Sequence, residues 1–197
     1  KTKALFAGRC GPPLLQLYFD LNKLLRKGAV YSATTTWIFR AGPVVSLSAV
    51  LICALMAPLG NCPAPLMLNG AMVAFIYLLA LGRFFTVAAA MDTGSSFEGM
   101  GGSRETQFSA LAEPALFLAL AALARQAGTF SLSDMMPRIT AAMWMQATPA
   151  LCILVLVLFI VLLAENARIP VDDPNTHLEL TMIHEVMVLD HSGPDLA

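Results

Sequence analysis

Glu113 lies within an otherwise apolar run, residues 110–123, of the kind that crosses a membrane as a helix. A carboxylate there has no water to hydrogen-bond, so it usually faces the interior of a helix bundle or a wet cavity. Pro114 follows it and lacks the backbone N–H that the carbonyl of Ala110 would accept, so water or a side chain must supply that hydrogen bond. These residue types predict a site where a proton is held or transferred within the membrane.

A second carboxylate, Glu105, stands eight residues before Glu113 on the same predicted helix. Eight residues correspond to roughly 12 Å along the axis, and the two side chains lie about 80° apart around it. Together with Arg104, the pair predicts a polar path that enters the membrane from one side. The alternative is a pair of ion-paired groups that only locks neighbouring helices together.

Several acidic residues and all three histidines fall within residues 165–191. Histidine titrates near neutral pH, so histidines beside carboxylates suit a proton relay. The spacing around His184 does not match the H-E-x-x-H pattern of metalloproteases, and a metal site formed by His177, Glu179 and His184 is the weaker interpretation. A solvated loop without chemistry is the remaining alternative.

Composition places these groups in a membrane protein. The chain has 197 residues, of which 57% are hydrophobic and only 13% are charged, whereas an ordinary soluble domain carries about 25% charged residues. A formal net charge of −1 argues against a nucleic-acid partner. The four cysteines show no C-x-x-C spacing, so no disulfide framework, zinc site or iron–sulfur site is predicted, and any redox metal belongs to a partner.

About four transmembrane helices are predicted, which makes the chain an all-α polytopic membrane protein. Residues 41–82 contain no charged side chain and are interrupted by Asn61-Cys-Pro-Ala-Pro, so they supply two spans. The predicted spans are 41–60, 67–90, 104–125 and 139–164. Before them, residues 13–27 place leucines at i, i+3 and i+4 spacing opposite charged residues. This pattern predicts an amphipathic helix at the membrane interface or against a partner protein.

The basic residues predict the topology. Most of them precede the first span or fall in later loops on its side, and only Arg125 and Arg138 lie on the other side. The positive-inside rule therefore puts both ends of the chain in the cytoplasm. We expect a single membrane domain over residues 1–197, with a cytoplasmic or interfacial segment at 1–40, the four transmembrane helices within 41–164 and a cytoplasmic acidic and histidine-containing loop at 165–197. The chain begins without Met and ends without a closing element, so we expect a fragment of a larger helical subunit.

Residues 91–105 are predicted to form a glycine-rich loop between the second and third spans, with Ser103 as the N-cap of the third. The glycines match no phosphate-binding fingerprint, because no Lys-Ser/Thr follows them and no strand precedes them. We interpret them as tight turns.

Four groups of short segments resemble, in order, the large membrane subunit that anchors the hydrophilic arm of respiratory complex I and of related membrane-bound hydrogenases. The resemblance is to the NADH dehydrogenase subunit 1 family, and within it to the formate hydrogenlyase/hydrogenase-4 branch. The segments are Arg9-Cys-Gly-Pro-Pro-Leu-Leu-Gln with Asp20-Leu-Asn-Lys-Leu-Leu; Asp92-Thr-Gly-Ser-Ser-Phe; Gly102-Ser-Arg-Glu with Ala112-Glu-Pro; and Glu165-Asn-Ala-Arg-Ile-Pro-Val-Asp.

The resemblance implies a non-catalytic subunit in the plasma (inner) membrane of a prokaryote, which couples electron transfer in partner subunits to proton or ion translocation through buried carboxylates. A quinone-binding subunit of an NADH:quinone oxidoreductase and a passive scaffold that docks the soluble arm are the alternatives. The expected proton path comprises Glu105, Glu113, Glu165, Asp172, Glu179 and Glu185. The expected interface or quinone-like funnel comprises Arg9, Gln16, Asp20, Arg83, Asp92, Arg104 and Arg168.

The same resemblance implies the partners and cofactors. The expected partners are membrane lipid, an iron–sulfur small subunit and a large subunit of hydrogenase type, and antiporter-like membrane subunits. Iron–sulfur and nickel–iron centres are expected only in those partner subunits, and this chain is expected to bind no cofactor of its own, with quinone binding left open.

Overall fold

A computed structural model describes residues 6–8, 11, 13, 15–59, 62–166, 168, 171–172 and 182–196 of the chain. The chain divides into two compact units. The larger unit spans residues 34–189, and the smaller one combines residues 1–33 with residues 190–197.

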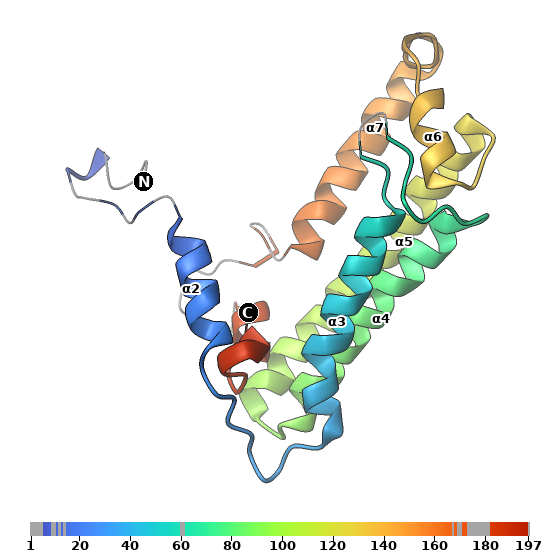
Figure 1. The fold of residues 1–197 in the computed structure, drawn as a ribbon. Coiled ribbons are helices and arrows are strands. Elements are labelled where there is room, and N and C mark those ends of the chain that lie inside the picture. The colour runs from blue at the N-terminus through green and yellow to red at the C-terminus, as the bar shows by residue number, and fades with distance from the viewer. Residues whose placement is uncertain are drawn as a thin grey trace. The chain divides into compact units, whose positions relative to one another are not determined.

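Among the described residues, four helices of the larger unit are long and apolar enough to cross a membrane, which confirms the predicted polytopic all-α class. They are α3 (Trp37–Met56), α4 (Ala71–Asp92), α5 (Ser96–Ala127) and α7 (Ala141–Glu165). In the part of the chain that is described, α3 packs along α4, α4 along α5, and α5 against α7 (Figure 1). Most large apolar side chains of these helices face outward, as expected for surfaces that meet lipid or other subunits.

The third span begins earlier than the sequence predicted. Helix α5 starts at Ser96, so the expected loop at 91–105 is wrong beyond its first few residues, and Ser103 lies inside the helix. The turn between α4 and α5 is made at Gly94, whose φ of 70° favours glycine. Among the later glycines, Gly101 instead allows close packing, because a Cβ there would lie 2.9 Å from Cγ of Met187.

The other end of α5 is closed by α6 (Leu132–Arg138), which folds back on it. The Arg138 guanidinium donates from Nη1 to the carbonyl of Ala127 at 2.7 Å, which satisfies a carbonyl left open at the helix end. A core cluster forms where α4, α5 and α6 meet; its buried members are Met72, Ile76, Ala124, Ala127 and Met135.

A single helical turn, α8 (His184–Met187), packs on α4 and α5 at the opposite end of these helices. Met187 of this turn and Ile183, which precedes it, are buried against Ala90 of α4. Residues 173–181, which precede it and include the predicted site residue Glu179, lie outside the described residues.

The smaller unit contains α2 (Gln16–Leu25) and the 3₁₀ turn η1 (Gly193–Leu196). Helix α2 covers the core of the amphipathic segment predicted at 13–27. It has no fully buried residue: Leu17 and Leu25 are exposed, and Leu21 and Leu24 are half-buried. Within this unit, the amide of Val30 donates to the Ser192 hydroxyl at 3.1 Å. The two chain-distant segments are therefore joined by a direct hydrogen bond.

Candidate functional site

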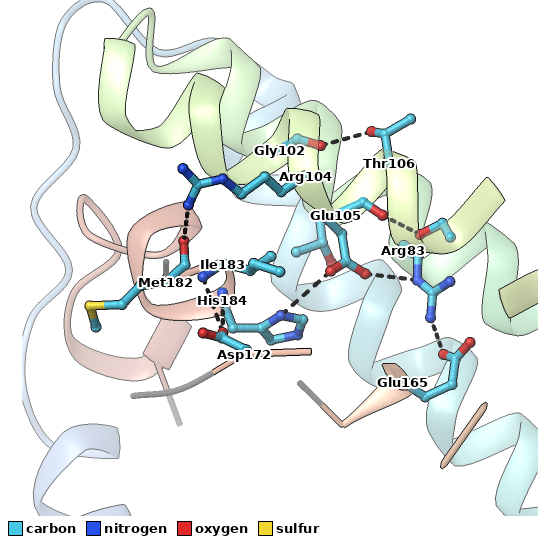
Figure 2. Close-up of polar contacts among 12 residues, drawn as sticks. Arg83, Gly102, Arg104, Glu105, Thr106, Glu165, Asp172, Met182, Ile183 and His184 are labelled. Atoms are coloured by element: carbon cyan, nitrogen blue, oxygen red, sulfur yellow. Dashed lines mark hydrogen bonds and ion pairs between the residues drawn. The ribbon is translucent and has the colours of Figure 1, made fainter. Parts of the chain in front are cut away.

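Arg83 lies at the centre of a buried ion cluster that joins three transmembrane helices. From α4, its guanidinium contacts Glu105 of α5 at 3.0 Å, Glu113 of α5 at 3.5 Å, and Glu165 at the end of α7. Figure 2 shows the guanidinium between the Glu105 and Glu165 carboxylates. The structure thus brings together three of the predicted proton-path carboxylates on one predicted interface residue.

The helices explain this convergence. Glu105 and Glu113 lie on broadly the same side of α5, as their spacing predicts, and α4 passes along that side. The planar guanidinium presents several N–H donors in a fork, so one side chain binds several carboxylates at once. A lysine ammonium is a single point charge and does not match this arrangement.

The cluster is shielded unevenly from its surroundings. The side chains of Arg83 and Glu105 are 13% and 7% exposed, whereas those of Glu165 and Glu113 are 22% and 37% exposed. Three carboxylates against one guanidinium leave two negative charges in excess when all four groups are ionised. Such an excess inside membrane helices is costly unless protons or other cations offset it.

Two cavities meet at Arg83. One, of about 550 Å³, is walled mostly by apolar residues of α3, α4 and α7, and its polar end is formed by Arg83, Glu105, Glu165, Asn166 and His184. The other, of about 400 Å³, lies between α4 and α5 and contains Glu113, Thr106 and Ser109. Glu105 faces the first cavity and Glu113 the second, so the guanidinium separates the two carboxylates of α5.

The α8 segment completes the polar end of the first cavity. The His184 imidazole places Nδ1 3.8 Å from Oε2 of Glu105, the carboxylate oxygen that does not face Arg83 (Figure 2). Asp172 is buried, and its Oδ2 accepts hydrogen bonds from the amides of Ile183 at 3.1 Å and His184 at 3.2 Å. Arg104 donates from Nη1 to the Met182 carbonyl at 3.2 Å.

The remaining predicted site residues make other contacts, are exposed, or lie outside the described residues. Asp92 accepts hydrogen bonds from the amide and hydroxyl of Thr36 and so ties the start of α3 to the end of α4. Gln16 donates to Asp20 at 2.9 Å on the exposed surface of α2, in the smaller unit. Arg168 and Glu185 are exposed, and Arg9 and Glu179 are not described.

The family assignment rests on the sequence as a whole. A sequence model of the family described as NADH dehydrogenase matches residues 1–197. The chain belongs to this NADH dehydrogenase family. Two relatives from Escherichia coli (strain K12) are similar to it: formate hydrogenlyase subunit 4, 33% identical over 182 residues, and hydrogenase-4 component C, 34% identical over 197 residues.

The matches to the relatives cover 91% and 100% of this chain, but only 58% and 61% of the relatives themselves. The NADH dehydrogenase family member described here therefore spans about three-fifths of their length. By name, one relative is a subunit of formate hydrogenlyase and the other a component of hydrogenase-4. These findings confirm the family resemblance deduced from the four groups of motifs.

The sequence analysis of this NADH dehydrogenase family member did not predict that Glu98 is buried. Its side chain is fully buried on α5, on the helix face that also carries Gly101, Gly102 and Glu105. The signal was present in the sequence, because Glu98 precedes Glu105 by seven residues, or two helical turns. It was overlooked because this stretch was interpreted as a loop, where a carboxylate is solvated.

Proposed function

We propose that this chain is the membrane-anchor subunit of a hydrogenase-4/formate hydrogenlyase-like complex related to complex I. In this role it couples electron transfer in partner subunits to proton or ion translocation through Glu105, Glu113 and Glu165. The names of the two relatives support the type of complex. The Arg83 cluster supports the coupling role.

The excess negative charge of the cluster is the observation that carries the proposal. A purely structural lock is satisfied by one carboxylate for one guanidinium, and the additional carboxylates only raise the cost of burial. Three carboxylates around one cation instead form a coupled set that takes up a proton and shares it. Binding and release of that proton changes the charge that holds α4, α5 and α7 together.

The two cavities define the two ends of the proposed proton transfer. A proton on Glu105 or Glu165 faces the first cavity, and a proton on Glu113 faces the second. Transfer between them requires the guanidinium to release one carboxylate and hold another. The 3.5 Å contact with Glu113 is the longer of the two measured contacts on α5, and this carboxylate is also the most exposed, so we expect it to be released first.

The partner and cofactor assignments belong to the same proposal. Docking of an iron–sulfur subunit would place the electron-transfer chain beside this membrane chain, with antiporter-like subunits receiving the transferred charge. A quinone head group would need free hydrogen-bond donors. At the polar end of the first cavity the Arg83 guanidinium already contacts three carboxylates, so quinone binding there is not part of this proposal.

Glu113→Gln and Glu105→Gln test the coupling role, because glutamine keeps the shape of the side chain but does not titrate. In membrane vesicles that carry the complete complex, we expect normal assembly, continued hydrogen turnover and proton uptake per turnover reduced to near background. Asp134→Asn is the matched control, since Asp134 is an exposed carboxylate on α6, away from the cluster.

Unchanged proton uptake in both glutamine variants would leave the carboxylates as structural groups and support the passive-scaffold alternative. Loss of uptake in the Asp134→Asn control as well would show that the assay reports general damage to the complex.

A further inference from the structure

The α8 turn stands between the exterior of the larger unit and its most deeply buried cluster carboxylate. The His184 side chain is 47% exposed, whereas that of Glu105 is 7% exposed. Its Nδ1 lies 3.8 Å from a Glu105 oxygen that Arg83 leaves open. The His184 side chain is thus partly exposed and also lies next to the cluster.

Separate contacts hold the backbone that carries this imidazole. The buried Asp172 carboxylate binds the backbone amide of His184 itself, and the Arg104 guanidinium binds the carbonyl of Met182 two residues earlier. Gly101 lets the turn approach α5 more closely than any other residue would, because a Cβ there would lie 3.0 Å from the Ile183 carbonyl oxygen.

We propose that His184 is the proton-exchange residue of the cluster, which passes protons between the exterior at the α8 end and the Glu105 carboxylate. This inference rests on the proposed coupling function and adds the group through which the cluster gains or loses protons. Asp172 and Arg104 act as positioning residues, because they contact the backbone around His184 rather than the transferred proton.

The transfer step is a simple exchange. The imidazolium of His184 gives the proton on Nδ1 to Oε2 of Glu105, which leaves a carboxylic acid and a neutral imidazole that keeps its proton on Nε2. Rotation of the ring then turns the free Nδ1 outward, where it takes a proton from a hydronium ion in the exterior water. A distance of 3.8 Å is too long for direct transfer. A rotation of the ring that closes it to about 2.6–3.2 Å, or one bridging water, suffices.

The charges around His184 favour this role. From α5, Glu105 and Glu98 lie on the face that meets α8, and Arg104 approaches from the same helix. Arg83 of α4 and Glu165 of α7 line the shared cavity. Along the segment that carries His184, the nearest acids are Asp172 and Glu185. Carboxylates outnumber guanidinium groups in this set, so a positive charge on the imidazole is attracted towards the cluster. Transfer of the proton then lowers the charge excess by one.

The test uses vesicles that carry the complete complex with His184→Gln. Glutamine retains a hydrogen-bonding group but does not titrate, so we expect normal hydrogen turnover, a rate of coupled proton uptake lowered by about tenfold or more, and loss of the dependence of that rate on pH near neutrality. His184→Ala should respond to added imidazole, which can enter at the exposed position and restore uptake.

The outcomes separate this inference from the proposed function. Loss of coupling in Glu105→Gln with wild-type rate and pH profile in His184→Gln would overturn the role of His184 and leave the coupling function intact. Wild-type coupling in both variants would overturn both. If His184→Gln assembles poorly, rescue of His184→Ala by imidazole supports the role, and a low rate that imidazole does not raise contradicts it.

Discussion

Arg83 binds carboxylates from two other helices, and the geometry of its guanidinium limits what could replace it. Removing the positive charge leaves three carboxylates close together inside membrane helices, which is far costlier than removing both members of a simple pair. The contribution of this side chain to stability therefore depends on how many of its partners stay ionised.

Arg83→Gln should reduce the yield and thermal stability of the assembled complex, because breaking a buried ion pair on one side costs about 3–5 kcal/mol. Adding Glu105→Gln to Arg83→Gln should recover part of that loss, since it removes one of the unpaired buried charges. The measurement is the melting temperature of the purified complex in a double-mutant cycle with the two single variants.

Additive losses in that cycle would contradict the ion cluster, because independent residues do not compensate one another. Arg83→Lys is the informative control: it keeps the charge but lacks the fork of donors, so its melting temperature should fall between those of the wild type and Arg83→Gln.

At the scale of helices, the first two turns of α5 act as a platform for α8. Both Gly99 and Gly101 belong to this stretch, but only one of them lies under the turn. A Cβ at Gly101 would lie 2.9 Å from Met187 and 3.0 Å from the Ile183 carbonyl, whereas a Cβ at Gly99 would meet no atom within 4 Å. These two glycines therefore form a matched pair.

Gly101→Ala should displace α8 and with it His184, while Gly99→Ala should leave α8 in place and stabilise the helix by up to about 1 kcal/mol through its better propensity. Hydrogen exchange of the amides in residues 182–189 measures this directly in the complete complex. We expect faster exchange in Gly101→Ala alone. Equal protection in the two variants would mean that α8 does not depend on close contact with α5.

At the scale of the whole molecule, the smaller unit joins residues 1–33 to residues 190–197 and contains a buried histidine, His191. Burial lowers the pKa of His191, and the nearby Asp195 and Asp190 carboxylates only partly oppose this effect. The folded unit therefore favours the neutral imidazole. The contribution of the neutral His191 to the stability of this unit is complete above the ordinary histidine pKa of about 6.5. This contribution is lost as the pH falls towards the lowered pKa.

Hydrogen exchange of residues 27–33, corrected for the intrinsic effect of pH, should therefore accelerate when the pH is lowered from about 7.5 to about 5.5. Val30 is the most informative amide, because it donates to the Ser192 hydroxyl next to His191. His191→Gln should abolish the pH dependence. A response to pH that persists in this variant would assign it to other groups.

The sequence by itself determined the class of the protein and most of its helices. Uncharged runs long enough to span a bilayer are a local property, because the backbone in lipid must satisfy its own hydrogen bonds and forms a helix wherever such a run occurs. The eight-residue spacing that places Glu105 and Glu113 on one side of α5 is equally local. The observed spans differ from the predicted ones mainly at their ends, as α5 illustrates.

Only the tertiary structure decided which groups meet. The contacts of Arg83 with Glu105 and Glu165, and of His184 with Glu105, join residues between 22 and 82 positions apart, and such contacts depend on how helices pack rather than on spacing along one helix. The same holds for Gly101: its lack of a side chain predicted a turn, but the packing of α8 used it for close approach within a helix. A glycine permits both, and the neighbouring element determines which one occurs.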